Sequence, residues 1–216
     1  MSLAHNGVLF LDEILEFNHE ILELMRGPLE DKNITINRVS GSLSYPCNFI
    51  LIASMNPCPC GYYGSDIKEC TCSPLQISKY INKLSGPLLD RIDIHIEVKS
   101  VKYKDLSTST IAESSAEIKK RVNNARNLQI KRYKNDGIYS NSQLDSNLLT
   151  KYCVLSEDCK LLLEKAFNNL GLSARAHNRI LKLARTIADL DNSKDIKINH
   201  LAEAIQYRSL DRKYWR

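Results

Sequence analysis

The stretch Gly7-Val8-Leu9-Phe10-Leu11-Asp12-Glu13 decides the fold expected for this 216-residue chain. Its apolar run predicts a short strand that is buried on both faces of a sheet. Two acids, Asp12 and Glu13, follow the strand directly, and the carboxyl ends of strands in an open α/β sheet form the crevice where ligands bind. One acid could hold Mg²⁺ while the other orients or deprotonates a water that attacks a phosphoryl group. Alternatively, the acids only favour the first turn of the next helix.

Helix and strand patterns alternate over the first 98 residues, which predicts an α/β fold for this part. Helices are expected around Asn18 to Leu29 and from Pro74 to Leu84, a β-hairpin from Asn33 to Tyr45, and further strands at Asn48 to Ser54 and Asp93 to Val98.

Residues 99–216 contain no comparable strand pattern and predict an all-α lid. A capping-box sequence, Ser114-Ser-Ala-Glu117, opens one helix, and Ser156, Ser173 and Asn199 begin three more. Charge also changes at this boundary: residues 1–98 carry 7 Lys+Arg against 12 Asp+Glu, whereas residues 99–216 carry 23 against 13. The basic second part is suited to a polyanionic partner, although a solvated lysine-rich helix face gives the same pattern.

Composition excludes several classes of protein. The spacing of the eight glycines matches neither the phosphate-loop motif G-x-x-x-x-G-K-[ST] nor the dinucleotide-binding motif G-x-G-x-x-G. The longest apolar runs, Gly7 to Leu11 and Phe49 to Ala53, are far shorter than the ~18 residues that cross a bilayer, so no membrane association is expected. Seven cysteines, an odd number, with no export signal at the start favour a cytoplasmic protein with reduced thiols. Residues 1–3 are interpreted as a cloning tag.

Two further polar residues follow or precede predicted strands. Asn56 comes just after the strand that ends at Ser54, where its amide can position a water or a phosphate oxygen. Arg91 lies in a loop before the strand at 93–98, where a guanidinium can neutralise charge that develops in phosphoryl transfer. An ion pair of Arg91 with Asp90 or Asp93 is the alternative.

Four motifs in this order, GVLFLDE, ASMNPCPCG, SGPLLDRIDIHIEV and LSARAHNRILKLARTIADL, closely resemble the magnesium-chelatase-like branch of AAA+ ATPases. More narrowly, they resemble the bacterial competence-associated ComM/YifB group. The resemblance covers nearly the whole chain after the tag. It implies an ATP- and magnesium-dependent P-loop ATPase that assembles as a homo-oligomer, usually a hexameric ring, with a partial α/β core at 1–98 and a helical lid at 99–216.

The resemblance also implies a role for each matching residue. Asp12 and Glu13 match the Walker B pair, Asp12 for the magnesium shell and Glu13 as activator of the hydrolytic water. Asn56 matches sensor 1, and Arg91 the arginine finger that acts on a neighbouring subunit's nucleotide. Arg175 matches the sensor 2 arginine. A second candidate for nucleotide binding, Arg179, lies one turn along the same predicted helix, where a solvated basic face would look the same.

The chain departs from the family pattern at its front, where Walker A should precede Walker B. The glycine spacing shows no such motif, so the chain is interpreted as the C-terminal part of a longer ATPase. On that interpretation the sheet is incomplete, and the chain alone binds ATP poorly and does not hydrolyse it.

The sequence also predicts a metal site and a DNA contact. The pairs Cys58-Pro-Cys60 and Cys70-Thr-Cys72 fit a tetrahedral zinc site, with reduced or oxidation-prone thiols as the alternative. The hairpin at 33–45 occupies the place of the pre-sensor-1 hairpin in the resembling family, so Arg38 near its tip is a candidate contact to DNA phosphate. Packing of the hairpin on its own subunit is equally compatible.

Three functions remain open from the sequence. The resemblance favours an ATP-driven motor that acts on DNA in branch migration during recombination or competence. A magnesium-chelatase motor subunit that powers metal insertion into a porphyrin is the second, and a zinc-stabilised, non-enzymatic interaction module is the third.

Overall fold

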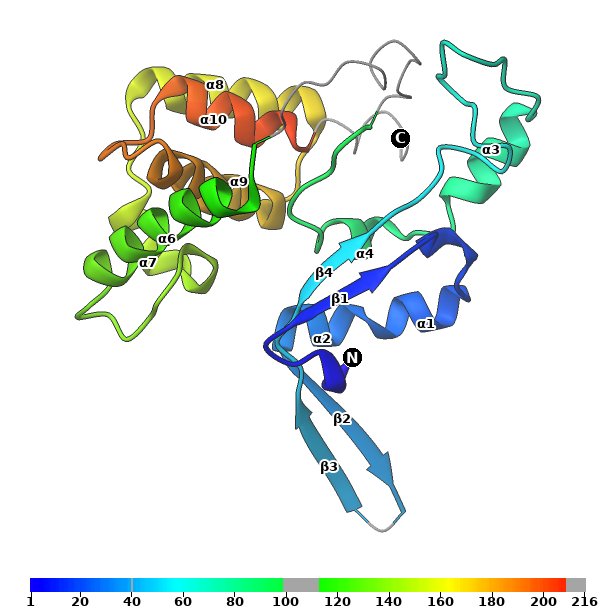
Figure 1. Ribbon diagram of the computed structural model, residues 1–216, viewed down its shortest axis with the longest axis horizontal. Helices are drawn as coiled ribbons and strands as arrows, with labels where there is room; N and C mark the ends of the chain where they lie inside the picture. Colours follow the sequence, from blue (N-terminus) through cyan, green and yellow to red (C-terminus); the bar gives the residue numbers. More distant parts are fainter. Residues whose placement is uncertain (40, 99–112, 209–216) are drawn as a thin grey trace. The chain divides into compact units, whose positions relative to one another are not determined.

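The computed structural model describes residues 1–39, 41–98 and 113–208 (Figure 1). Residues 1–92 form one compact unit, and residues 93–97 together with 113–208 form another. The first unit contains parallel strands, a hairpin and short helices, and the second is helical. The expected fold class, a partial α/β core followed by a helical domain, is confirmed. The expected boundary after residue 98 adjoins residues 99–112, which lie outside the described residues.

The first unit is built around two parallel strands, β1 (Val8–Leu11) and β4 (Ile50–Ala53). They pair in register, so that Val8 lies opposite Ile50 and Leu11 opposite Ala53. Figure 1 shows them side by side in dark blue and cyan. Because parallel strands run in the same direction, the residues that follow Leu11 and Ala53 emerge at one edge of the sheet.

This sheet is apolar on both faces, but only one face is covered. Leu9 and Leu11 pack against the core of the unit, whereas Val8 is 55% exposed and Phe10 is 59% exposed. The sequence predicted that both faces of the strands at Gly7 to Leu11 and Asn48 to Ser54 are buried. That prediction is wrong for this structure. The reason is that no element among the described residues of this unit covers the second face, where Ile50 is also exposed.

The segment around Asn18 to Leu29 forms two short helices instead of one. Helix α1 (His19–Leu24) begins at Asn18, whose side chain accepts a hydrogen bond from the Glu20 backbone at 2.9 Å. Helix α2 (Arg26–Asp31) follows after Met25. Pro28 has no N–H to donate to the carbonyl of Leu24, which interrupts a continuous helix here.

The hairpin forms as predicted. Strands β2 (Asn33–Arg38) and β3 (Gly41–Pro46) are antiparallel, with Arg38 opposite Gly41. Gly41 has φ +137°, a backbone conformation that residues with a Cβ atom rarely adopt. Glycine therefore suits this position next to the turn. Most of the side chains on both strands are exposed, and the hairpin is drawn extending from the strands β1 and β4 in Figure 1.

The last helices of the first unit are α3 (Pro74–Ile81) and α4 (Gly86–Leu89), each opened by a serine. Ser73 and Gln76 form a reciprocal capping box, and Ser85 accepts from the Leu88 backbone at 3.2 Å. These helices contribute buried side chains to the same core as the strands.

The prediction of a strand at Asp93 to Val98 is wrong. The segment has no strand partner among the described residues, and the backbone N–H of His95 donates to the carbonyl of Tyr207 at 2.9 Å. Alternating Ile94 and Ile96 gave a strand pattern, but a strand requires a neighbouring strand with which to form a hydrogen-bond ladder.

Within residues 113–208, the second unit contains five α-helices and one short 3₁₀ helix, η3 (Asn141–Gln143). Most begin at the residues that the sequence predicts, with side-chain caps from Ser114, Ser156 and Ser173. A short helix capped by Asp145 is an addition to the prediction. The helices are α6 (Ser115–Arg132), α7 (Ser146–Tyr152), α8 (Glu157–Leu170), α9 (Ala174–Leu190) and α10 (Ile198–Gln206).

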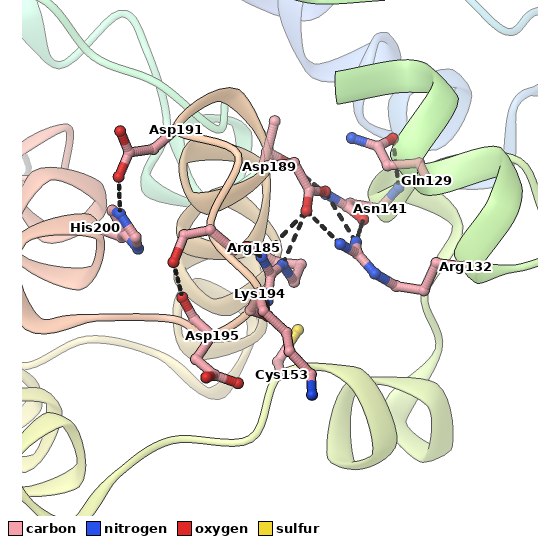
Figure 2. Close-up of polar contacts among 12 residues, drawn as sticks. Gln129, Arg132, Asn141, Cys153, Arg185, Asp189, Asp191, Lys194, Asp195 and His200 are labelled. Carbon is pink, nitrogen blue, oxygen red and sulfur yellow. Dashed lines mark hydrogen bonds and ion pairs between the residues drawn. The ribbon is translucent and has the colours of Figure 1, made fainter. Parts of the chain in front are cut away.

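The centre of the second unit combines apolar packing with a buried ionic network. Asp189 on α9 is fully buried, and Arg185, one turn before it, is 4% exposed at its side chain. Arg132 of α6 donates to Asp189 from Nη1 and Nη2 of its guanidinium, and Asn141 donates from its amide at 2.9 Å (Figure 2). This hydrogen bonding by Asp189 is the main cause that raises the pKa of Arg132.

Arg185 is also fixed from its other side. Its guanidinium donates to the backbone carbonyls of Ser193 at 2.6 Å and Lys194 at 2.8 Å, beyond the C-terminus of α9. The network thus joins α6, α9 and the loop that leads to α10. Buried ionic groups need such a full set of partners because desolvation is costly.

Among the described residues, no helix has both the length and the apolar character that a membrane span needs.

Candidate functional site

Two acids and a serine meet where strands β1 and β4 end. Asp12 and Glu13 follow β1 directly, and Ser54 follows β4 directly. The Ser54 hydroxyl donates to the carboxylate of Asp12 and accepts a hydrogen bond from the backbone N–H of Glu13 at 3.1 Å. The side chain of Ser54 therefore ties both acids to the end of the neighbouring strand.

Glu13 has an unusual backbone conformation. Its φ of 50° and ψ of 52° lie in the left-handed region, which residues other than glycine seldom adopt. The N–H of Ile14 donates to the Ser54 carbonyl at 2.9 Å, and the N–H of Ser54 donates to the Leu11 carbonyl at 3.0 Å. These bonds hold the strained residue in place on both sides. Non-glycine residues in this region cluster at functional sites, where surrounding structure fixes them.

Asn56 lies two residues beyond Ser54 and is exposed. The loop that follows turns back against it, since a Cβ added at Gly61 would lie 4.0 Å from the Asn56 Oδ1. This region of the chain therefore offers two carboxylates, a hydroxyl and an amide oxygen. Such hard oxygen donors are those that Mg²⁺ prefers, so the residues present fit that ion.

Arg91 is held within its own unit. Its side chain is 8% exposed and forms an ion pair with Glu30, while Nη1 donates to the Pro87 carbonyl at 2.7 Å. An ion pair within the chain, expected as the alternative role of Arg91, is thus present, with Glu30 as partner. Contact of Arg91 with a neighbouring subunit's nucleotide stays a prediction.

The other predicted arginines lie elsewhere in the chain. Arg175 is exposed in the first turn of α9, and Arg179, one turn later, forms an ion pair with Asp93. Both belong to the second unit. Arg38 is exposed at the end of β2, beside the hairpin turn. The structure thus brings Asp12, Glu13 and Ser54 together, with Asn56 two residues further on, and gives Arg91 and Arg179 partners of their own.

The four predicted metal-ligating cysteines are close together. The Sγ atoms of Cys58, Cys60, Cys70 and Cys72 all lie within 4.8 Å of one another, and all seven cysteines of the chain are free thiols. Cys58 is fully buried, and its sulfur accepts a hydrogen bond from the Tyr63 backbone at 3.3 Å.

The thiols of this cysteine cluster differ widely in pKa. A hydrogen bond from the Tyr62 backbone, reinforced by those from neighbouring groups, lowers the pKa of Cys60 to about 5. The Cys72 backbone lowers the pKa of Cys70, but desolvation and the neighbouring sulfurs together outweigh it and raise that pKa to about 12. Negative charge on one sulfur opposes ionisation of the next when no cation is bound.

Sequence reasoning missed Ser54 and Glu30. The signal for Ser54 was its place as the last residue of a predicted strand, on the same rim as Asp12. Glu30 carried no such signal, because its pairing with Arg91 spans 61 residues of sequence and depends on tertiary packing.

A parallel α/β core with acids at the carboxyl edge of its strands, followed by a helical unit, fits the AAA+ class. Comparison of the sequence with protein families gives two matches. Residues 1–106 match the family described as magnesium chelatase, subunit ChlI, and residues 112–208 match the C-terminal family of the same subunit. The chain belongs to the magnesium-chelatase-like family, in the group that includes YifB and ComM.

Three relatives illustrate the range of similarity. The chain is 44% identical to the uncharacterized protein YifB of Escherichia coli over 98% of its length, and 43% identical to the competence protein ComM of Haemophilus influenzae. It spans 41% of the length of each of these two proteins. The ChlI subunit of magnesium chelatase from Mesostigma viride is 25% identical over 54% of the chain and 26% of its own length.

Replacing Ser54 by alanine is expected to weaken the affinity of this edge for Mg²⁺, and with it any binding of a magnesium–nucleotide by the full-length protein. The change removes the hydroxyl that positions Asp12 and that accepts from the Glu13 backbone. Loss of a hydrogen bond to a charged group costs about 1.5–3 kcal/mol at most, and water replaces part of it at this exposed edge, so a decrease of about 3- to 10-fold in affinity is expected. Titration with a fluorescent ATP analogue measures it.

The matched control is Ser42→Ala, which removes a strand hydroxyl that donates to Asn37 at 2.7 Å in the hairpin. Equal affinity of Ser54→Ala and the unaltered protein, both with magnesium present, would contradict the role given to Ser54.

Proposed function

We propose that this chain supplies the part of an ATP-hydrolysing AAA+ motor that runs from the Walker B acids to the helical lid. The observation that carries the proposal is the edge of the sheet where Ser54 joins Asp12 and Glu13 at the ends of two parallel strands. Membership of the magnesium-chelatase-like family supports it.

The residues of this edge have distinct proposed roles. Asp12, oriented by the Ser54 hydroxyl, binds the magnesium ion that accompanies ATP. That ion would neutralise charge on the phosphates. Glu13 holds the attacking water and accepts its proton, and its fixed backbone limits where its exposed carboxylate can reach. Asn56 donates from its amide to the water or to a γ-phosphate oxygen.

The arginines complete the proposed machinery. Arg91 leaves its ion pair with Glu30 and contacts the nucleotide bound by an adjacent subunit. The subunits form a ring of identical chains, proposed to be a hexamer. Arg175 reaches the γ-phosphate from the lid, with Arg179 as a second candidate. A guanidinium suits both tasks because it presents several donors to phosphate oxygens in a fixed plane.

The phosphate-binding loop comes from sequence outside this chain in our proposal. No phosphate-loop motif can be written with its glycines, and the relatives are more than twice as long. The exposed apolar face of β1 and β4 agrees with this, because Val8, Phe10 and Ile50 would be buried by further elements of a complete sheet. This chain alone is therefore expected to bind ATP weakly and to lack turnover.

DNA is the proposed substrate of the motor. Residues 99–216 carry 23 basic against 13 acidic side chains, and the exposed Arg38 stands at the end of a hairpin strand. Basic side chains bind the phosphate backbone with a steep dependence on salt concentration. The similarity to a protein named for competence supports DNA over other polyanions. Branch migration during recombination is the proposed activity.

A magnesium-chelatase motor is the second candidate function. It is favoured by the match of both parts of the chain to the families of the ChlI subunit. In that case the motor would act on partner subunits that insert metal into a porphyrin, and DNA would leave its ATPase rate unchanged.

ATPase measurements on the full-length gene product test these proposals. The rate is measured alone, with single-stranded DNA, with forked DNA and with chelatase partner subunits, at two salt concentrations. Stimulation by DNA that disappears at high salt is expected. Stimulation only by the partner subunits would select the chelatase, and no turnover under any condition would overturn the ATPase proposal.

A further inference from the structure

The cysteine cluster lies in a loop without regular structure. Between the end of β4 at Ala53 and the start of α3 at Pro74, the chain has turns and bends only. Loops of this length are uncommon in compact proteins unless they are functional or held by other means. Two glycines allow its turns, since Gly61 has φ +81° and Gly64 has φ +78°. What holds this loop has to come from its side chains.

Sulfur positions in the cluster match those of a tetrahedral metal site. The Sγ of Cys58 lies 3.4 Å from that of Cys60 and 3.7 Å from that of Cys70, and Cys60 and Cys70 are 3.6 Å apart. A tetrahedral zinc ion with Zn–S bonds of about 2.3 Å separates its sulfurs by about 3.8 Å. A disulfide would bring two of them to about 2.05 Å. The spacing therefore favours a bound cation over disulfide bonds.

The surroundings of the cluster suit thiolate ligands. The backbone N–H of Tyr63 donates to the Cys58 sulfur, and the Tyr62 and Thr71 backbones hydrogen-bond to Cys60. Backbone donors of this kind orient the ligands and stabilise negative charge on them. The ammonium of Lys68 lies over the ring of Tyr62, 4.7 Å from the ring centroid, in a cation–π contact. A divalent cation at the centre would offset two of the four negative charges on the thiolates and hold the sulfurs together.

We propose that Cys58, Cys60, Cys70 and Cys72 bind one structural zinc ion that closes the loop following Asn56. All four positions of a tetrahedral site are then filled by sulfur, which makes the site structural and leaves no open position for a reactant. Because Gly61 of the loop lies against the Asn56 amide, the bound ion also fixes the backbone that carries Asn56. Only the expected consequence for ATP hydrolysis, through Asn56, rests on the proposed function.

Metal analysis of the chain, purified under reducing conditions without chelators, tests the site directly. We expect about one zinc ion per chain by elemental analysis. Replacement of zinc by Co²⁺ alone should give the visible absorption and thiolate charge-transfer bands of a tetrahedral sulfur site. Cys58→Ser and Cys70→Ser should each lower the zinc affinity at least about 10-fold, measured against a chromophoric chelator.

Cys47→Ala and Cys153→Ala are the matched controls, since these cysteines are buried and lie outside the cluster. Both should keep the full zinc content. Alkylation of the unaltered chain should spare the four cluster thiols until a chelator is added, a readout that needs no variant to fold. Less than about a tenth of an equivalent of zinc after reconstitution, or a preference for iron, would overturn the proposal.

In the full-length protein, zinc removal is expected to lower the ATPase rate. A protein that binds zinc but shows no ATPase activity would support the proposed metal site and contradict the proposed motor function. A protein that hydrolyses ATP but binds no zinc would do the reverse.

Discussion

Replacing Asp189 by alanine is expected to lower the free energy of unfolding of the helical unit by about 3–5 kcal/mol. The buried carboxylate accepts hydrogen bonds from Arg132, Arg185 and Asn141 (Figure 2), and the Arg185 side chain is only 4% exposed. Without Asp189, the guanidinium of Arg185 would stay buried without its carboxylate. Because a typical domain is stable by about 5–15 kcal/mol, this loss should unfold a large fraction of the unit on mild heating.

Urea denaturation followed by far-UV circular dichroism measures the change, because the second unit is helical. Asp195→Ala is the matched control, since Asp195 is exposed and follows α9 by only a few residues. Asp189→Asn preserves the shape and one acceptor oxygen, so a smaller loss is expected. A change of less than about 1 kcal/mol in Asp189→Ala would show that the network contributes little to stability.

The elements that sequence predicted best are those whose signals are local. Ser114 and Glu117 form the predicted capping box, and the backbone N–H of Ser114 is the main cause that lowers the pKa of Glu117. Gly171 ends α8 in the left-handed conformation, as its place after the apolar stripe predicts. Each of these features depends on residues within one helical turn.

Predictions failed where the outcome depends on residues far apart. Segment 93–98 has the alternation of a strand but no neighbouring strand, and the runs at β1 and β4 are apolar on a face that this chain does not cover. The Arg185–Asp189 pair also escaped prediction, although its spacing of four residues on the apolar stripe of α9 was visible. Charged residues on a buried face are expected only when their partners are known, and Arg132 lies 57 residues away from Asp189.

The candidate site was predicted in part for the same reason. Asp12, Glu13 and Asn56 were placed by one rule, that strand ends gather at an edge of the sheet. The rule gives the neighbourhood but not the contacts, so the Ser54 hydroxyl between the two acids and the Glu30 partner of Arg91 emerged only from the structure.

Replacing Glu13 by glutamine in the full-length protein is expected to reduce the turnover number of the proposed ATPase reaction by about 10²–10⁴-fold, the usual contribution of a positioned general base. Glutamine has nearly the same shape and can still hold a water, but it cannot accept the proton. Nucleotide binding should therefore persist, because Asp12 and its bond from Ser54 are unchanged. Steady-state phosphate release and ATP-analogue titration measure the two quantities separately.

Glu16→Gln is the control, since Glu16 is an exposed acid in the same turn, and its carboxylate lies 3.9 Å from the ammonium of Lys83. It should keep the full rate. A Glu13→Gln protein that loses turnover and nucleotide binding together would indicate that the left-handed turn at Glu13 has been disturbed, and circular dichroism would detect a wider loss of structure. Retention of more than about a tenth of the original rate would instead place the general base at another residue, since removing a positioned base costs at least about 10²-fold.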